Sequence, residues 1–271
     1  MEFPQKGLPI NELKGDLAAL KSNDMDWKNA RAFSMVFRAS EDVSRVVETA
    51  LGMFVFENGL SPFAFPSLLR METEVVAMTA DLLHGGTTAA GNMTSGGTES
   101  IIMAVKAARD YARERRPEVK EPEMIIPRSA HPAFNKAAYY LGLKTVVVPT
   151  SESSEVDLDA YRQAFNSNTI FAMGSAFSYP HGIIDPIEKM AALADRKGIW
   201  FHVDSCVGGF MLPFLKKLGY PIPPFDFRVP GVMSMSADVH KYGYVSKGAS
   251  IVLYRDGELR KYQLFVYTDW P

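Results

Sequence analysis

Short apolar, β-branched runs alternate with amphipathic stretches from residue 124 onward. The runs have the length and composition of buried strands. They lie at residues 124–126, 145–148, 170–173, 199–203, 232–235 and 250–254. The stretches with helical spacing lie at residues 134–141, 157–165, 186–197 and 213–218. Strands that are apolar throughout and separated by helices predict an α/β fold, with a mostly parallel sheet flanked by helices on both faces.

Residues 1–70 have a different pattern, with helical periodicity, irregular breaks and no strand signal. A helix is predicted to begin after Ser40, because apolar residues then recur at helical spacing. Residues 58–66 contain two prolines and read as a loop, and a further helix is predicted over residues 72–83. We therefore expect an N-terminal helical segment of residues 1–70 and a large domain of residues 71–271.

The composition is ordinary for a soluble globular protein with a real core. Of the 271 residues, 47% are hydrophobic and 22% are charged, with a net charge of −2. Such a charge offers no electrostatic reason to expect nucleic acid as a partner. No apolar run approaches the ~20 residues of a membrane span, and no signal peptide is evident. A single cysteine, Cys206, excludes an internal disulfide, and we expect a cytoplasmic location.

A glycine-rich tract, TSGGTES at residues 94–100, precedes a predicted helix. Free amides and the helix dipole make such a helix start a candidate anion site, and glycine lets a ligand approach the backbone closely. The alternative is a flexible turn in which Thr98 caps the helix. The tract is not a P-loop, because no lysine follows Gly97 in the required spacing.

Three further candidates follow predicted strands, and ligands of open α/β sheets bind beyond the carboxyl ends of strands. Asp204 at the end of one strand would need a partner if buried, and a protonated pyridine nitrogen is one such partner. Lys241 follows the next strand, and partial burial that lowers its pKa would make it a Schiff-base nucleophile. His131 follows an earlier strand and could stack on a ring or move protons. The alternatives are a capping or salt-bridged aspartate, a surface lysine and a structural histidine.

The four candidates together resemble one family in kind and order. The motifs TSGGTES (94–100), HVDSCVGGF (202–210) and SADVHKYGY (236–244) are similar to the group II decarboxylases that depend on pyridoxal 5′-phosphate (PLP). Within that superfamily they look most like sphingosine-1-phosphate lyases, with further matches at PHGIIDP (180–186) and FDFRVPGV (225–232). The resemblance runs from about residue 62 to residue 271. It implies PLP as cofactor and fold type I, the aspartate-aminotransferase-like fold of PLP-dependent transferases.

The resemblance also implies roles around the cofactor. Gly97 and Thr98 would bind the PLP phosphate with His240 beside it, while His131 would stack on the ring and Cys206 would pack near its other face.

In the same way, the resemblance assigns the chemistry of the reaction to three residues. Asp204 would pair with the pyridine nitrogen, Lys241 would hold the cofactor as a Schiff base, and Tyr179 would move protons near the substrate. No metal is expected.

The substrate side departs from the lyase pattern. Lys247 corresponds to a lysine that holds the substrate phosphate in the lyases. The lyase pattern NPLHP reads NGLSP from Asn58, so Ser61 stands in place of the phosphate-binding histidine, and Phe37 stands where a tyrosine is expected. Losing two of three phosphate ligands weakens the case for a phosphorylated sphingoid substrate. We expect an amine or amino-acid substrate.

These features lead to three functional hypotheses. The first is a PLP-dependent carbon–carbon lyase that cleaves a bond to Cα of an amine through an external aldimine. The second is an amino-acid decarboxylase, and the third is an inactive, truncated PLP-fold protein that acts as a dimerisation partner. Relatives continue past the tract at residues 267–271, so a small C-terminal domain is expected to be missing. We expect a homodimer in which residues 1–70 form an arm around the partner.

Overall fold

The computed structural model describes residues 2–29, 32 and 34–269, and it divides into two compact units. Residues 1–38 form the first unit, which contains helix α1 (Ile10–Lys21) and the 3₁₀ helix η1 (Trp27–Asn29). Residues 39–271 form the second, so the boundary expected after residue 70 falls inside a helix of this unit. Trp270 and Pro271, the end of the tract used to infer truncation, lie outside the described residues. The dimer-arm role of residues 1–70 stays a prediction.

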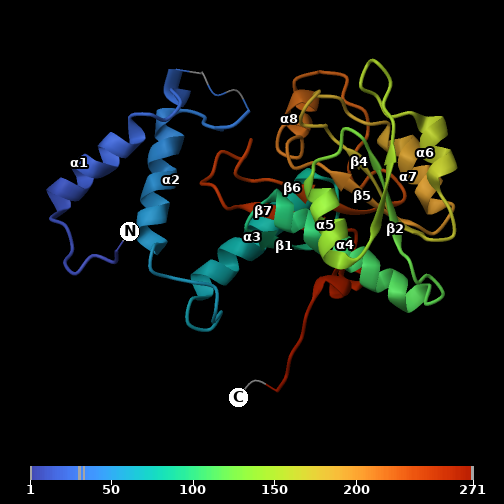
Figure 1. Ribbon diagram of the computed structural model, residues 1–271, viewed down its shortest axis with the longest axis horizontal. Coiled ribbons are helices and arrows are strands. Elements are labelled where there is room, and N and C mark those ends of the chain that lie inside the picture. Colours follow the sequence, from blue (N-terminus) through green and yellow to red (C-terminus); the bar gives the residue numbers. More distant parts are fainter. Residues whose placement is uncertain (1, 30–31, 33, 270–271) are drawn as a thin grey trace. The chain divides into compact units, whose positions relative to one another are not determined.

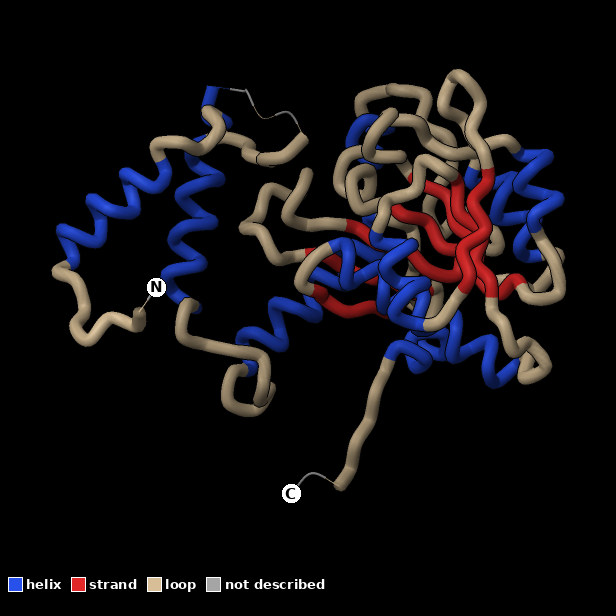
Figure 2. The backbone as a smooth tube through the Cα atoms, viewed as in Figure 1, coloured by secondary structure: helices blue, strands red, loops and turns tan. Residues whose placement is uncertain are grey.

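The second unit is built on a seven-stranded sheet with the order β1-β7-β6-β5-β4-β2-β3 (Figures 1 and 2). Its strands are β1 (Ala90–Thr94), β2 (Glu123–Pro127), β3 (Lys144–Val148), β4 (Thr169–Ser175), β5 (Trp200–Asp204), β6 (Val232–Ala237) and β7 (Ser250–Tyr254). Strands β3, β2, β4, β5 and β6 are neighbours in that order and pair in parallel. Strand β7 pairs antiparallel with both β6 and β1. The predicted mostly parallel sheet is confirmed.

Strand β1 was not predicted, because its sequence AGNMT has neither an apolar run nor clear alternation. Its place at the sheet edge comes from backbone pairing with β7, in which Gly91 lies opposite Leu253. A Cβ at Gly91 would lie 2.4 Å from the carbonyl oxygen of Val252. The close approach of the two backbones therefore requires glycine here, at a position without a strand signal in the sequence.

Helices precede, connect and follow the strands, and the four helices predicted between strands are confirmed to within two residues at either end. The helices of this unit are α2 (Glu41–Phe54), α3 (Pro66–Leu82), α4 (Gly97–Arg115), α5 (Ala133–Leu141), α6 (Leu158–Ala164), α7 (Ile187–Asp195), α8 (Leu212–Lys217), α9 (Gly257–Arg260) and the 3₁₀ helix η2 (Lys261–Gln263). The start of α6 has a local cause, since the Asp157 carboxylate accepts hydrogen bonds from the amides of Asp159 and Ala160, both at 2.9 Å.

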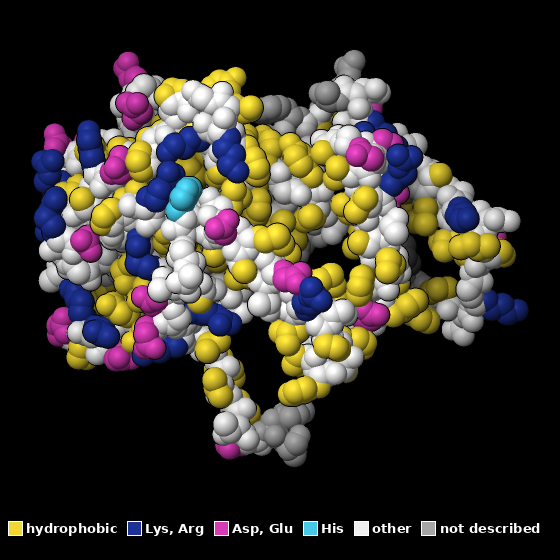
Figure 3. Space-filling model, turned by 180° about the vertical axis from the view of Figure 1, so that it is seen from behind, with side chains coloured by type: hydrophobic (Ala, Val, Ile, Leu, Met, Phe, Trp, Pro, Cys, Tyr) yellow, Lys and Arg dark blue, Asp and Glu magenta, His cyan; other side chains and the backbone are white. Residues whose placement is uncertain are grey.

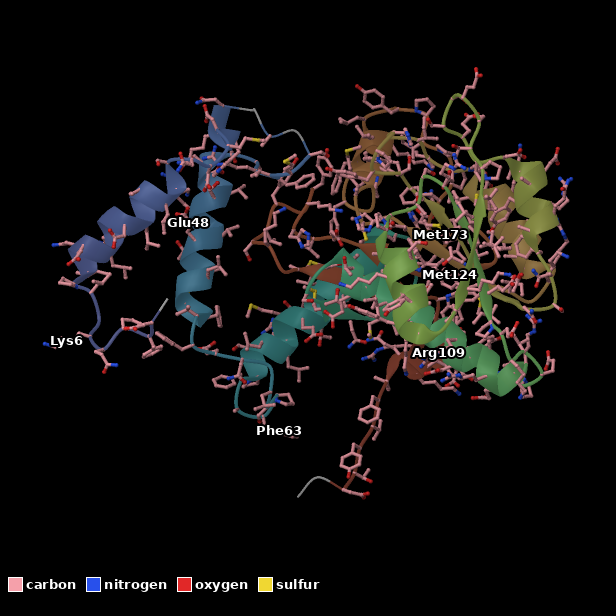
Figure 4. The ribbon with its side chains drawn as sticks, in the orientation of Figure 1. Lys6, Glu48, Phe63, Arg109, Met124 and Met173 are labelled. Atoms are coloured by element: carbon pink, nitrogen blue, oxygen red, sulfur yellow. The ribbon has the colours of Figure 1, made fainter. Side chains whose placement is uncertain are left out.

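The sheet separates two hydrophobic cores, because successive strand residues point to opposite faces. In β2, Met124 packs into the core beneath α4 and α5, whereas Ile125 packs into the core beneath α7. Met124 and Met173 are labelled among the side chains around the sheet in Figure 4, and both are fully buried. Figure 1 shows α4 and α5 lying together. This two-sided burial fixes the strand register, and with it the side chains that reach the sheet edge.

A buried carboxyl group lies just beyond the end of β4. Asp185 is 1% exposed, and its Oδ2 accepts a hydrogen bond of 2.7 Å from the amide of Ser175. Its Oδ1 is buried without a hydrogen-bond partner in the described part of the chain. Burial penalises the charged form and raises the pKa of Asp185 to about 6.

The pKa of Asp185 predicts a loss of stability as the pH rises. The neutral carboxyl stabilises the folded state fully below the ordinary value of 3.8, and this contribution is lost as the pH rises through about 6. Asp185→Asn keeps an acceptor for Ser175 and removes the ionisation. We expect the free energy of unfolding of the natural protein to fall by roughly 2–3 kcal/mol relative to the variant between about pH 4 and pH 8. Urea unfolding at both pH values measures this, and parallel pH profiles would contradict it.

Candidate active site

A cavity of about 350 Å³ lies where strands β4, β5 and β6 end. Ser175, Asp204 and Asp238, which end or follow these strands, line it together with the start of α4. The cavity lining includes every residue predicted at the cofactor: Gly97, Thr98, His131, Tyr179, Asp204, Cys206, His240 and Lys241. Cavities of this size hold small ligands. The carboxyl edge of the sheet thus brings together residues that lie up to 146 positions apart in the sequence, from Ser95 to Lys241.

The glycine-rich tract forms the first turn of α4. Gly96 is the residue before the helix, and no side chain caps it, so the alternative of a Thr98 cap is wrong. A Cβ at Gly97 would lie 2.8 Å from both carboxylate oxygens of Asp238 and 2.9 Å from Cys206 Sγ. The Glu99 carboxylate accepts hydrogen bonds of 2.6 Å from the amide and hydroxyl of Ser95. The turn is therefore held by its own side chains, with uncapped amides at the cavity.

Lys241 forms an ion pair with Asp238, whose role was missed. The Lys241 Nζ lies 2.9 Å from Asp238 Oδ2, and Asp238 is 3% exposed. Burial disfavours the ammonium, but the negative charge of Asp238, its hydrogen bond to Lys241 and the charge of Asp204 favour it and hold the pKa of Lys241 above its ordinary value. The expectation that burial would lower this pKa is therefore wrong. The sequence signal for this ion pair was the spacing of Asp238 and Lys241, because an acid three residues before a lysine can reach it across one turn of backbone.

Asp204 is buried at the end of β5 with both of its hydrogen bonds on one oxygen. Its Oδ1 accepts from the amide of Cys206 at 3.0 Å and from the hydroxyl of Ser236 at 3.3 Å. Among the described residues, none donates a hydrogen bond to Oδ2. The Asp204 side chain is 7% exposed and lines the cavity. The carboxylate is thus held from behind and has one oxygen available to a donor.

In both histidines of the cavity, a hydrogen bond determines which ring nitrogen is the acceptor. His131 Nδ1 accepts a hydrogen bond of 3.1 Å from the amide of Ala133, and His240 Nδ1 accepts one of 3.1 Å from the amide of Ala249. A neutral ring in either place therefore carries its proton on Nε2. Burial lowers the pKa of His240, which favours the neutral form. His240 Nε2 lies 3.7 Å from Asp238 Oδ2.

The residues expected to contact substrate lie apart from this lining. Lys247 Nζ donates to the carbonyl oxygen of His240 at 3.5 Å, and burial lowers the pKa of this lysine. The side chain of Asn58 accepts from the amide of Leu60, and the hydroxyl of Ser61 accepts from the amide of Ala64. Asn58 and Ser61 stabilise their own loop, and their roles at a substrate stay predictions.

The described residues lack two further features. Within residues 2–29, 32 and 34–269, no cluster of His, Cys, Asp and Glu side chains is arranged to hold a metal ion. In the same described residues, no helix is both long and apolar enough to cross a membrane.

Comparison with known proteins identifies the family. Residues 1–267 match the model of the pyridoxal-dependent decarboxylase conserved domain. The chain belongs to the pyridoxal-dependent decarboxylase family. The resemblance inferred from the motifs is confirmed, and PLP is the cofactor of the family.

Several individual relatives of this chain are named sphingosine-1-phosphate lyases. The chain is 47% identical to a sphingosine-1-phosphate lyase of Oryza sativa and 46% identical to sphingosine-1-phosphate lyase 1 of Rattus norvegicus, in each case over 99% of its length. It covers 51% and 47% of those proteins, so it spans about half the length of the curated relatives it matches.

Solved structures confirm the fold of this chain. The structure of a sphingosine-1-phosphate lyase of Burkholderia pseudomallei superposes with a TM-score of 0.94 at 43% identity, covering 100% of this chain and 64% of that one. A glutamate decarboxylase of Lactobacillus brevis superposes with a TM-score of 0.84 at 21% identity, covering 96% of this chain and 60% of that one. The second likeness shows the fold alone, which is that of fold type I.

The buried polar atoms of the cavity fit PLP. Asp238 Oδ1 is buried without a partner in the described part of the chain, and the Oδ2 of Asp204 has no donor there either. An acceptor at Asp204 suits a protonated ring nitrogen, and the Lys241 amine suits an aldehyde. The uncapped amides at Gly97 suit a phosphate. The residues present therefore match a charged, aldehyde-bearing, phosphorylated ring.

The crowding at Gly97 predicts a difference between two neighbouring glycines. Gly97→Ala places a methyl group against the Asp238 carboxylate and Cys206, so we expect a loss of about 1–3 kcal/mol in the free energy of unfolding. Gly96→Ala is the matched control, because its Cβ would meet only His240 Cε1, at 3.8 Å. We expect the control to change stability by less than about 1 kcal/mol. Denaturant unfolding of both variants without cofactor checks this, and equal stabilities would refute the tight fit at Gly97.

Proposed function

We propose that this chain carries the PLP-binding part of a carbon–carbon lyase that cleaves a bond to Cα of an amine substrate. The support is that relatives at 46–47% identity over nearly the whole chain are named sphingosine-1-phosphate lyases. A decarboxylase named for aspartate, from Pyrococcus furiosus, is 34% identical over 94% of the chain. The lyase reaction is therefore the first proposal, and loss of a carboxylate from an amino acid is the alternative that the assay below separates.

The observation that carries the proposal is the convergence of a lysine, a buried aspartate and a histidine on one cavity. Lys241, Asp204 and His131 follow three different strands and meet at the carboxyl edge. When bound, PLP supplies a protonated ring that accepts the electrons of the broken bond. Asp204 would hold the proton on the ring nitrogen, because a carboxylate beside it stabilises the positive charge.

Lys241 and Asp238 would control the proton at the amine. Lys241 Nζ must be neutral to react with an aldehyde, and Asp238 Oδ2 at 2.9 Å is placed to take part in removing its proton. Asp238 Oδ1, buried and without a partner in the described part of the chain, gives that carboxylate further capacity to accept. We assign Asp238 to positioning and deprotonating Lys241.

Tyr179 and Lys247 would act on the substrate. The Tyr179 side chain lines the cavity and is 48% exposed, which suits a phenol that moves a proton on a substrate group entering from solvent. Lys247 lies at the margin of the site beside the His240 carbonyl and would hold an anionic group of the substrate. A single cation suits a carboxylate or one face of a phosphate.

Replacing the two lysines separates cofactor chemistry from substrate binding. We expect Lys241→Ala in the full-length protein to abolish both turnover and the covalent attachment of PLP that borohydride traps, because no other described side chain that lines the cavity carries an amine. Lys247→Ala is the matched control and should keep covalent attachment while raising the KM at least about tenfold.

Mass spectrometry after borohydride treatment and assays of aldehyde and carbon dioxide measure these outcomes. Aldehyde release supports the lyase and carbon dioxide release the decarboxylase. PLP attachment without either product in the full-length protein supports an inactive partner. Attachment that survives Lys241→Ala would remove Lys241 from its role.

The substrate of the proposed lyase depends on Ser61. We propose weak cleavage of sphingosine 1-phosphate and better activity on a smaller amine, because Ser61 and Phe37 replace two expected phosphate ligands. Ser61→His should raise kcat/KM for the phosphorylated base by about tenfold or more, since a hydrogen bond to a charged group is worth roughly 1.5–3 kcal/mol. Ser61→Asn, which adds no cationic ring, is the control. High activity of the unaltered protein on sphingosine 1-phosphate would contradict this reading of the two substitutions.

We further propose that the full-length protein is a homodimer, as exposed apolar side chains in the second unit suggest. Phe63 in the loop before α3 is 95% exposed, and no residue of α2 is buried. Figure 3 shows hydrophobic side chains at the surface on one face, and Figure 4 labels Phe63. Light scattering should give the mass of two chains, and Phe63→Asp should shift it toward one. Leu218→Asp, 74% exposed at the end of α8, is the control that should leave the mass unchanged.

A further inference from the structure

A line of polar side chains runs through the apolar core along one face of β5 and β6. In β5, Trp200, His202 and Asp204 share a face by the two-residue repeat of a strand. In the parallel pairing with β6, His202 lies opposite Ser234 and Asp204 lies opposite Ser236. Except for Asp204, these residues are 0–1% exposed and do not line the cavity. Polar groups so deeply buried are costly unless they are hydrogen-bonded to one another.

Their hydrogen bonds form a continuous chain that ends at Asp204. Trp200 Nε1 donates to Ser234 Oγ at 2.8 Å, and Ser234 Oγ lies 2.8 Å from His202 Nδ1. His202 Nε2 lies 3.2 Å from Ser236 Oγ, which donates to Asp204 Oδ1 at 3.3 Å.

The two ends of the chain determine its direction. The Trp200 indole can only donate, and an ionised Asp204 can only accept. In the described residues, the acceptor within reach of the Ser234 hydroxyl proton is His202 Nδ1, so Nδ1 accepts and the ring proton lies on Nε2. Nε2 then donates to Ser236, whose own proton goes to Asp204. The opposite direction would leave the Ser234 hydroxyl proton buried without an acceptor, which costs about 1–3 kcal/mol.

Two neighbouring features support this direction. Burial lowers the pKa of His202 to about 3, so the ring is neutral and one nitrogen is free to accept. Burial also raises the pKa of Cys206 well above its ordinary value, so its thiol keeps its proton and donates to Ser236 Oγ at 3.2 Å. Ser236 thus receives two donors, and the acceptor left for its single proton is Asp204.

We propose that His202 and Ser236 are positioning residues that direct a one-way chain of hydrogen bonds, from Trp200 to Asp204, and so orient the Asp204 carboxylate toward the cofactor nitrogen with Ser236 as its donor. A donor to a carboxylate stabilises its charged form and lowers its affinity for a proton. A proton shared between Asp204 and the pyridine nitrogen therefore lies on the nitrogen. This inference rests on the proposed PLP site for its consequence, but the chain of hydrogen bonds is a property of the protein alone.

The first experiment tests the direction of the chain without the cofactor. Nitrogen-15 NMR of the full-length protein, labelled at histidine, reports which ring nitrogen of His202 carries the proton. We expect a neutral ring with its proton on Nε2 across the pH range in which the protein is folded. A proton on Nδ1, or a His202 ring that gains a second proton near pH 6, would overturn the inference whether or not PLP binds.

The second experiment tests the consequence at the cofactor. Holoenzyme is prepared with PLP labelled with nitrogen-15 at the ring, and the chemical shift of that nitrogen reports its protonation. We expect Ser236→Ala to shift the equilibrium between nitrogen and Asp204 by about tenfold toward Asp204, the effect of losing one hydrogen bond to a charged group. Ser236→Thr keeps the hydroxyl and should restore the signal of the natural protein.

A matched control separates this role from general packing. Ser205 is also fully buried and adjacent to Asp204, but its hydroxyl donates to the carbonyl oxygen of Ser236 at 2.6 Å and not to the carboxylate. Ser205→Ala should leave the ring nitrogen signal unchanged. An unchanged signal in Ser236→Ala, or an equal shift in Ser205→Ala, would overturn the inference.

A third variant covers the case in which Ser236→Ala does not fold. Ser236→Cys keeps the size of the side chain and replaces the hydroxyl by a weaker donor, so the ring nitrogen signal should shift in the direction expected for Ser236→Ala. An unchanged signal in that variant would overturn the inference. Failure of the natural protein to attach PLP would instead refute the proposed function and leave the result of the first experiment in force.

Discussion

Burying a carboxylate costs several kcal/mol unless it is paired, and the buried carboxylates of Asp204 and Asp238 line the cavity where the central strands end. Asp238 is paired with Lys241 at 2.9 Å, and Asp204 accepts from Cys206 and Ser236. Each has a further oxygen without a donor in the described part of the chain. The site is thus organised around negative charge that is held from the protein side and open on the cavity side, as a cationic ring and an amine require.

The sheet makes this arrangement possible, because parallel strands end at the same edge. Asp204 ends β5 and Ser236 lies beside it in β6, so a hydroxyl from one strand reaches the carboxylate of the other. The antiparallel strand β7 lies on the far side of β6, where Ser250 donates to the carbonyl oxygen of Ala237. The Oγ of Ser100 in α4 lies 2.8 Å from the Oγ of Ser250, so a hydrogen bond connects the start of this helix to the sheet. The glycine turn and the carboxylates are therefore parts of one hydrogen-bonded framework.

Much of the site could be predicted from the sequence, because its residues occur in short motifs directly after apolar strands. The sequence pattern placed His131, Asp204 and Lys241 after predicted strands and Gly97 at a helix start, and all of them line the cavity. The role of Asp238 was not predicted, because an acid near a lysine is common on protein surfaces. Its low exposure of 3% depends on packing from elements that are distant in the sequence. The direction of the Lys241 pKa shift was missed for the same reason.

What the sequence determined by itself was the order of elements and the identity of the cofactor, because apolar periodicity and contiguous motifs are local. Strand β1 was decided by tertiary structure, since it forms by pairing with the distant strand β7. The chain of hydrogen bonds through His202 also depends on the tertiary structure. The residues His202 and Ser234 lie 32 positions apart, and only the register of two central strands sets them side by side. Burial, pairing and the pKa values that follow from them depend on distances that no local pattern contains.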